Sequence, residues 1–160
     1  MTIRSAGVLL CRVGDGAVEV LLGHMGGPFW ARKDAGAWSI PKGEYVDPEP
    51  ALDAAVREFT EELGVLLPVP REALVPLGDV RQRSGKLLTV WAAAGDLDPA
   101  VVVPGTFTME WPPRSGRFAE FPEIDRVAWW PLADARERIV TGQRPFLDRL
   151  LETCQTLSRP

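Results

Sequence analysis

The sequence is poor in the features that mark several large protein classes. Two cysteines, Cys11 and Cys154, occur in 160 residues, and their separation fits neither a zinc site nor a disulfide framework. Cys11 lies in an apolar run, where we expect a buried thiol. No apolar run approaches the length of a membrane span, and residues 1–4 lead into a strand pattern rather than a signal peptide. We therefore expect a cytoplasmic protein without a membrane segment.

The chain also lacks a surplus of basic residues. Its formal net charge is −4, which gives no electrostatic footprint for general nucleic-acid binding. Apolar residues make up 46% of the chain and charged residues 25%, a mixture typical of globular rather than disordered proteins. We find no internal repeat and no linker, so residues 1–160 are expected to form a single domain.

What the sequence does contain is an alternation of strand-like and helix-like segments. The first two strands are joined by Gly14-Asp15-Gly16, which suits a hairpin turn. Strands are expected at 6–13, 18–23, 77–83, 87–94, 107–111 and 126–130, and the last two helices at 132–140 and 145–154. With a further helix before Gly64, this order predicts an α/β fold, a mixed β-sheet sandwiched between helices (α/β/α).

The central helix is expected soon after Gly43. Asp47 can cap it, Pro48 suits its first turn, and Gly64 suits a left-handed C-terminal cap. Apolar residues in this segment recur at the i, i+3, i+4 spacing and predict one buried stripe. The stripe consists of Leu52, Ala55, Val56, Phe59 and Leu63.

Three acids of this helix are expected to lie together beside the stripe. At about 100° per residue, Glu58, Glu61 and Glu62 share one face. Like charges at these spacings destabilise a helix by a few tenths of a kcal/mol per pair, and a divalent cation would remove that cost. Carboxylate oxygens are the hard ligands that Mg²⁺ or Mn²⁺ prefers. The spacing therefore predicts a metal site on this face.

The segment from Gly43 to Val65 resembles the signature of the Nudix hydrolases, G-x5-E-x7-R-E-U-x-E-E-x-G-U, in which U is apolar. Every defined position is present. The fixed letters are Gly43, Glu49, Arg57, Glu58, Glu61, Glu62 and Gly64, and the apolar sites are Phe59 and Val65. With each residue type at about 7% of positions, seven fixed letters coincide by chance at on the order of 10⁻⁸ per start point. The resemblance implies the Nudix fold, which is also an α/β/α sandwich.

The resemblance also implies roles for individual residues. It places metal ligands at Glu58, Glu61 and Glu62 and at the carbonyl of Gly43, with Mg²⁺ (or Mn²⁺) as the cofactor. Arg57 would orient a catalytic carboxylate. Glu49 would support the site from outside, or act only as an acid near the helix N-terminus.

A further catalytic acid is expected from the loop before the last strand. In the family this glutamate precedes a tryptophan at the start of that strand by six residues, and Glu123 precedes Trp129 by that interval. Glu120 is the nearby alternative. The expected catalytic set is Arg57, Glu58, Glu61 and Glu123.

Several residues are candidates for binding a nucleotide. Lys42 can reach a phosphate as a point charge, or be a solvated loop lysine. Trp30 and Trp111 lie among turn residues, where an exposed ring can stack on a base. His24 is the single histidine. A lone histidine is more often a structural residue than a substrate contact, so we expect a structural role for it.

The expected activity is Mg²⁺-dependent hydrolysis of a phosphoanhydride bond in a nucleoside diphosphate linked to another group, as in a nucleoside triphosphate or a dinucleoside polyphosphate. The segment 38–43 is similar to the corresponding part of dinucleoside polyphosphate and mRNA-cap-type hydrolases. The remaining segments, including Glu110-Trp111-Pro112-Pro113 and Gly142-Gln143, resemble a bacterial branch of predicted nucleoside triphosphate pyrophosphohydrolases. We expect a small nucleotide as partner and a monomer or homodimer. The alternative is a catalytically silent nucleotide-binding or regulatory module of the same fold.

Overall fold

A mixed β-sheet forms the centre of the molecule. The structure is a computed structural model that describes residues 2–157, without the side chains at positions 152 and 154–157. The 7-stranded sheet has the order β3-β2-β1-β6-β5, with β4 paired to β1 and β9 paired to β2. The strands are β1 (Arg4–Gly14), β2 (Ala17–Met25), β3 (Trp38–Ser39), β4 (Lys42–Tyr45), β5 (Val75–Arg81), β6 (Leu87–Ala94) and β9 (Ile124–Pro131). β1 and β6 run parallel, whereas the other pairs are antiparallel.

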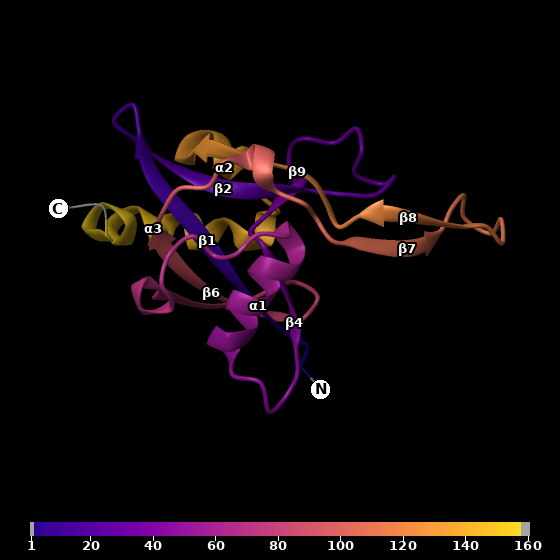
Figure 1. Cartoon of the computed structure of the whole chain (residues 1–160), viewed down its shortest axis with the longest axis horizontal. Coiled ribbons are helices and arrows are strands. Elements are labelled where there is room, and N and C mark those ends of the chain that lie inside the picture. Colours follow the sequence, from indigo (N-terminus) through magenta and orange to yellow (C-terminus); the bar gives the residue numbers. More distant parts are fainter. Residues whose placement is uncertain (1, 158–160) are drawn as a thin grey trace.

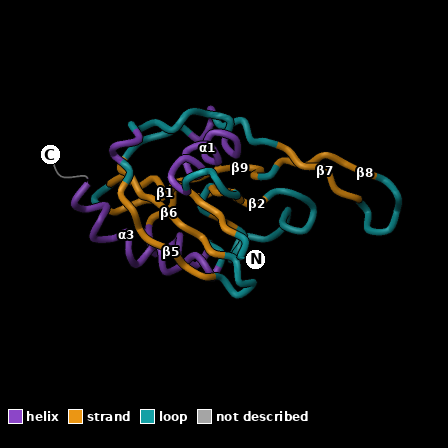
Figure 2. The backbone as a smooth tube through the Cα atoms, turned by 90° about the horizontal axis from the view of Figure 1, so that it is seen from below, coloured by secondary structure: helices purple, strands orange, loops and turns teal. Residues whose placement is uncertain are grey.

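Helices cover both faces of this sheet, as Figure 2 shows. α1 (Ala51–Leu63) packs on one face, and α2 (Leu132–Arg138) and α3 (Arg144–Leu157) pack on the other. Short 3₁₀ turns, η1 (Arg71–Ala73), η2 (Pro99–Val101) and η3 (Thr141–Gln143), lie in the connections. The predicted α/β class, with helices on both sides of a mixed sheet, is therefore confirmed.

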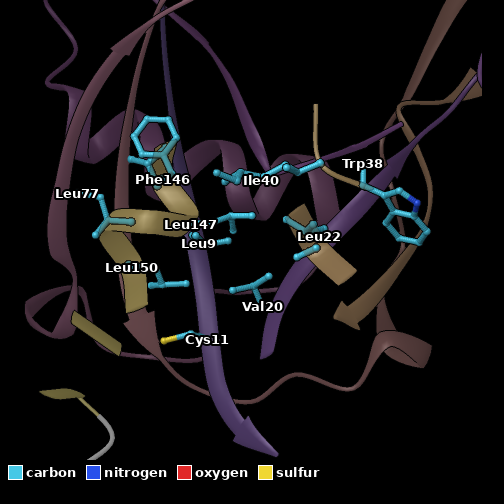
Figure 3. Close-up of a cluster of buried hydrophobic side chains, with 14 of the residues drawn as sticks. Leu9, Cys11, Val20, Leu22, Trp38, Ile40, Leu77, Phe146, Leu147 and Leu150 are labelled. Atoms are coloured by element: carbon cyan, nitrogen blue, oxygen red, sulfur yellow. The ribbon is translucent and has the colours of Figure 1, made fainter. Parts of the chain in front are cut away.

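Each face of the sheet has its own apolar core. The core on the α3 side contains Phe146, Leu147 and Leu150, which meet strand residues of β1 and β2 (Figure 3). The core on the α1 side is built around Phe59, which is fully buried. Truncating a buried phenylalanine typically costs about 3–5 kcal/mol, so Phe59 fixes α1 firmly on the sheet.

α1 begins later than the sequence predicts. Its first residue is Ala51, and Pro50 occupies the N-cap without a side-chain hydrogen bond. Asp47, the predicted cap, instead forms an ion pair of 2.6 Å with Arg4. The reason is that a proline disfavours helical dihedrals at the residue before it, so Pro50 keeps Glu49 out of the helix. The predicted end is confirmed, because Gly64 has φ of 67° and caps the helix.

Two parts of the strand pattern differ from the prediction. Segment 38–45, for which no strand was predicted, contributes β3 and β4. The expected strand at 107–111 is β7 (Thr106–Glu110), and it pairs with β8 (Phe118–Pro122), which the sequence did not indicate. Figures 1 and 2 show this β7–β8 hairpin projecting from the body of the molecule.

Cys11 is fully buried, as expected, but it is disulfide-bonded, so the expectation of a buried thiol is wrong. A disulfide requires spatial proximity, which separation along the sequence does not report. The side chain of Cys154 lies outside the described residues. Within residues 2–157, no helix is long and apolar enough to cross a membrane.

Candidate active site

The predicted acidic face of α1 is present. Ala54, Ala55, Phe59 and Leu63 point into the core, and the three glutamates lie on the remaining surface toward β4. The side chain of Glu58 is 16% exposed and that of Glu61 is 59% exposed. Burial therefore differs among neighbouring acids, and their electrostatic environments differ with it.

One guanidinium group links three of the carboxylates. Arg57 donates two parallel hydrogen bonds to Glu49, both of 2.8 Å. Its remaining terminal nitrogen, Nη1, donates to Glu58 at 2.7 Å and to Glu61 at 3.0 Å. These contacts agree with the predicted role of Arg57 in orienting carboxylates, and they bring Glu49 to the edge of the same cluster.

β4 approaches the glutamates through its backbone. The Lys42 N–H donates to Glu62 Oε2 at 2.8 Å. A Cβ atom placed on Gly43 would clash with the Glu58 carboxylate, so any larger residue there would displace that side chain. Lys42 and Gly43, both predicted as site residues, thus lie directly against α1.

Burial dominates the titration of two of the acids. Desolvation raises the pKa of Glu62 from 4.5 to about 8, although the Lys42 N–H and the Lys42 charge oppose the shift. Desolvation also raises the pKa of Glu58, against the opposing effect of Arg57. Negative charge on Glu123 raises the pKa of both groups. The site therefore concentrates more negative charge than its own cations balance.

Glu123 reaches this cluster from the start of β9. Its backbone is held on both sides, because its N–H donates to Gly105 O at 2.8 Å and its carbonyl accepts from Gly26 N at 3.0 Å. The neighbouring Gly105 lies against α1, where its N–H is 3.4 Å from Glu62 O. Glu120, the alternative acid, lies on β8 and accepts a hydrogen bond of 2.5 Å from Thr106 Oγ1. Glu123 thus follows a backbone segment that lies against α1, whereas the Glu120 carboxylate is paired within the β7–β8 hairpin.

Among the side chains that the structure describes, no group of three or more His, Cys, Asp or Glu residues is arranged to hold a metal ion. The present hydrogen bonds account for this arrangement. Arg57 donates hydrogen bonds to Glu58 and Glu61, and the Lys42 N–H donates one to Glu62. The donor set nevertheless fits a hard cation, because all the acids supply oxygen ligands and Gly43 brings its backbone against the Glu58 carboxylate.

The predicted aromatic contacts lie in two different settings. Trp30 packs against the core on the α3 side, with the Lys33 ammonium 5.1 Å from its ring centroid. Trp111 lies at the end of β7 and meets Phe29 edge to face, with 5.3 Å between ring centroids. The structure thus separates the two tryptophans and pairs Trp111 with a residue that the sequence did not indicate.

His24 is structural, in agreement with the sequence analysis. The ring is fully buried, its Nδ1 lies 3.0 Å from both Asp125 carboxylate oxygens, and its Nε2 lies 2.6 Å from Lys33 O. It therefore joins the loop after β2 to the start of β9, where Glu123 lies. Two other contributors were missed, namely Gly105 and Phe29; the turn residues Pro104-Gly105 were the available signal for a close backbone approach.

A family model described as "NUDIX domain" matches residues 1–150. Among curated proteins, none matches the chain.

Solved structures share the fold at low sequence identity. The Ap4A hydrolase of C. elegans, in a binary complex, is 21% identical with a TM-score of 0.65, over 97% of this chain and 99% of that one. The NUDIX domain of Shewanella oneidensis NrtR, complexed with ADP ribose, is 18% identical with a TM-score of 0.64, over 96% of this chain and 89% of that one. RenU, a Nudix hydrolase from M. smegmatis, is 24% identical with a TM-score of 0.57, over 98% of this chain and 88% of that one.

Proposed function

The chain belongs to the NUDIX domain family, and on that premise we propose that it is a Mg²⁺- or Mn²⁺-dependent hydrolase of nucleotides. Its substrate is a nucleoside diphosphate linked to another group, and the bond that it cleaves is a phosphoanhydride. The reaction class follows from the family, whereas the metal and the substrate are our inferences from the residues of the site.

The observation that carries this proposal is the carboxylate cluster around Arg57. Glu58, Glu61 and Glu62 lie on one face of α1, Gly43 lies against Glu58, and the charge of Glu123 acts on Glu58 and Glu62. Stability alone does not explain such a cluster, because burial and mutual repulsion make it unfavourable for Glu58 and Glu62 to be ionised. A cation would offset both penalties.

The residues present fit such a cation. Glu58, Glu61, Glu62 and the Gly43 carbonyl would hold it, since all four supply oxygen ligands. When bound, the metal supplies charge neutralisation at the phosphates and polarisation of a water molecule. Arg57 fixes the orientation of Glu58 and Glu61 and shares their charge. To Glu123 we assign the role of accepting a proton from a water molecule at the cluster.

The substrate class is inferred from groups around the cluster. The positive charge of Lys42 is close enough to lower the pKa of Glu62, and so to reach a phosphate at the same site. The Trp111 ring, on the hairpin that precedes Glu123, offers a face for a base, and Trp30 is the second candidate. One structural neighbour is an Ap4A hydrolase, and another is a NUDIX domain complexed with ADP ribose. In Ap4A and in ADP ribose alike, a nucleoside diphosphate carries a further group.

The competing proposal is a silent nucleotide-binding or regulatory module. Such a module has no physical need for three adjacent glutamates and a fourth acid across from them. Turnover distinguishes the two functions directly, because a module binds nucleotide without converting it.

The test is a panel of nucleotides assayed with and without Mg²⁺. We expect wild-type turnover of at least one nucleoside diphosphate derivative. Turnover should fall by at least about 10²-fold in Glu61→Gln or Glu62→Gln, because each substitution removes an anionic ligand and keeps the shape of the side chain. Glu120→Gln is the matched control, since its carboxylate lies on β8. Near-normal turnover in both α1 variants would refute the metal site, and binding without turnover by the wild type would favour the module.

A further inference from the structure

We propose that Gln143, in η3 between α2 and α3, is a positioning residue for the active site. Its side-chain amide fixes the backbone that delivers Lys42 and Gly43 to the glutamates of α1. This inference rests on the proposed function, because it assigns Gln143 to the same site.

The need for such a residue arises where the chain changes its strand partner. β3 pairs with β2, with Ser39 opposite Gly23. β4 pairs with β1, with Lys42 opposite Gly7. Ile40 and Pro41 connect the two strands. The backbone of Ile40 therefore has no hydrogen-bond partner in a neighbouring strand, and Pro41 has no N–H to donate.

Gln143 supplies the missing partner for Ile40. Ile40 N donates to Gln143 Oε1 at 2.9 Å, and Gln143 Nε2 donates to Ser39 Oγ at 3.0 Å. Ser39 Oγ in turn donates to Ile40 O at 2.9 Å. These three bonds close a ring that satisfies both backbone polar groups of Ile40. The ring excludes water, because Gln143 is 1% exposed, Ser39 4% and Ile40 0%.

The ring is connected to the site by a short, stiff path. From Ile40 the chain passes through Pro41, whose carbonyl accepts from Val8 N at 3.2 Å, and reaches Lys42. The N–H of Lys42 is the hydrogen-bond donor to Glu62, and Gly43 then meets Glu58. A shift of Ile40 therefore moves the two backbone groups that face the α1 carboxylates.

A purely packing role would not call for an amide. Burying an unpaired amide is costly, so a core position is normally filled by an apolar side chain unless its hydrogen bonds are needed. Here both polar atoms of Gln143 are used on residues 39 and 40. The backbone nearby is also tied to the α2–α3 connection, since Val140 N donates to Trp38 O at 2.8 Å. The η3 turn thus acts as a rigid support for the lead-in to β4.

The experiment compares three variants of the full chain. Gln143→Met keeps a similar volume and removes both side-chain hydrogen bonds, and Ser39→Ala removes only the hydroxyl. Arg149→Met is the matched control. Arg149 also joins the helical layer to the sheet, because it donates to Leu77 O at 2.9 Å and to Asp79 O at 3.0 Å, but these contacts lie at β5. Melting temperature, steady-state kinetics and amide hydrogen exchange in the metal-free protein are measured for each.

We expect Gln143→Met to speed hydrogen exchange of the amides in 38–45 about 10-fold relative to the rest of the sheet. The reason is that the lost hydrogen bond to Ile40 N protects this segment against local opening. We expect kcat to fall about 10-fold, at a temperature where every variant is folded, with a smaller change in KM. Ser39→Ala should show the same pattern more weakly, and Arg149→Met should lower the melting temperature without either change.

Two results would overturn the inference. One is unchanged exchange in 38–45 for both Gln143→Met and Ser39→Ala; the other is a loss of kcat in Arg149→Met as large as that in Gln143→Met. If Gln143→Met does not fold, Ser39→Ala decides alone. Absence of wild-type turnover would refute the proposed function, whereas the exchange measurement would still test how Lys42 and Gly43 are held.

Discussion

Glu62 is the residue whose charge depends most on its surroundings. Burial raises its pKa from 4.5 to about 8 in the metal-free protein. A raised carboxyl pKa means that the folded state binds the proton more tightly than the unfolded state. The resulting stabilisation is present below about pH 4.5 and is lost as the pH rises toward 8.

We therefore expect the melting temperature of metal-free wild-type protein to fall, relative to that of Glu62→Gln, between pH 5 and pH 8. Glutamine carries no charge at any pH, so it removes this contribution. Glu61→Gln serves as the control, because the Glu61 side chain is 59% exposed. Parallel pH profiles for wild type and Glu62→Gln would show that Glu62 is ionised at little cost.

Glu123 and Glu120 provide a matched pair of acids for the second prediction. We expect Glu123→Gln to lower the rate more than Glu120→Gln, because the negative charge of Glu123 acts on Glu58 and Glu62 whereas Glu120 pairs with Thr106. If Glu123 is the base, the alkaline rise of the pH–rate profile should also flatten in its variant. Equal and small effects of the two substitutions would assign Glu123 to the solvated surface.

At the scale of elements, α1 was the part of the fold most accessible to prediction. Its apolar stripe and its left-handed cap at Gly64 are local signals. The cap is confirmed, and so are Ala55, Phe59 and Leu63 of the stripe, whereas Leu52 and Val56 are only half-buried and Ala54 is buried as well. The start of α1 was misplaced because Pro50 disfavours helical dihedrals at Glu49, so the helix begins only at Ala51. The cluster of Glu58, Glu61 and Glu62 was predictable for the same reason as the stripe, since helical spacing alone places them on one face.

β3, β4 and β8 were not predictable from local pattern. β3 and β4 are short, and their partners, β2 and β1, lie earlier in the chain. β8 follows a turn rich in proline and glycine and pairs only across the hairpin. The contacts of Gln143 with residues 39 and 40 were hidden for a related reason: they join positions 104 and 103 residues apart.

The β7–β8 hairpin carries the third prediction. A two-stranded hairpin is marginally stable alone, and here Trp111 against Phe29, and Gly27 near Phe107, tie it to the loop after β2. If the Trp111 ring also stacks on the base of the substrate, Trp111→Ala should raise KM across nucleotides with a smaller change in kcat, because stacking is worth about 1–3 kcal/mol and differs little among bases.

Steady-state kinetics with two purine substrates and one pyrimidine substrate measure this effect, and thermal melting checks the fold. Phe29→Ala is the companion variant, since it removes the contact with Trp111 and leaves the tryptophan ring in place. A large fall in melting temperature with unchanged KM in Trp111→Ala would show that the ring only holds the hairpin.

For the whole molecule, the site lies between parts that are held independently. α1 is anchored by the core around Phe59, whereas the lead-in to β4 is anchored by Ile40 and Gln143 on the opposite side of the sheet. Glu123 comes from a third segment, fixed by Gly26 and Gly105. A cation held by ligands from α1 and β4 would connect two of these parts, so its binding should stabilise the entire fold.

The last prediction tests this coupling without any substrate. A ligand that binds only the folded state stabilises it by about 2.7 kcal/mol at 100 times its Kd. For a domain of this size, that corresponds to a rise in melting temperature of roughly 5–10 °C. We expect Mg²⁺, relative to Na⁺ at equal ionic strength, to produce this rise both in the wild type and in the control Glu120→Gln. Glu58→Gln and Glu62→Gln should lose most of the rise in melting temperature, because each removes one anionic ligand. General screening does not produce the rise, since both salts screen the chain's net charge of −4 equally at the same ionic strength. A rise of the same size in wild type and in both variants would place the stabilising cation elsewhere on the protein.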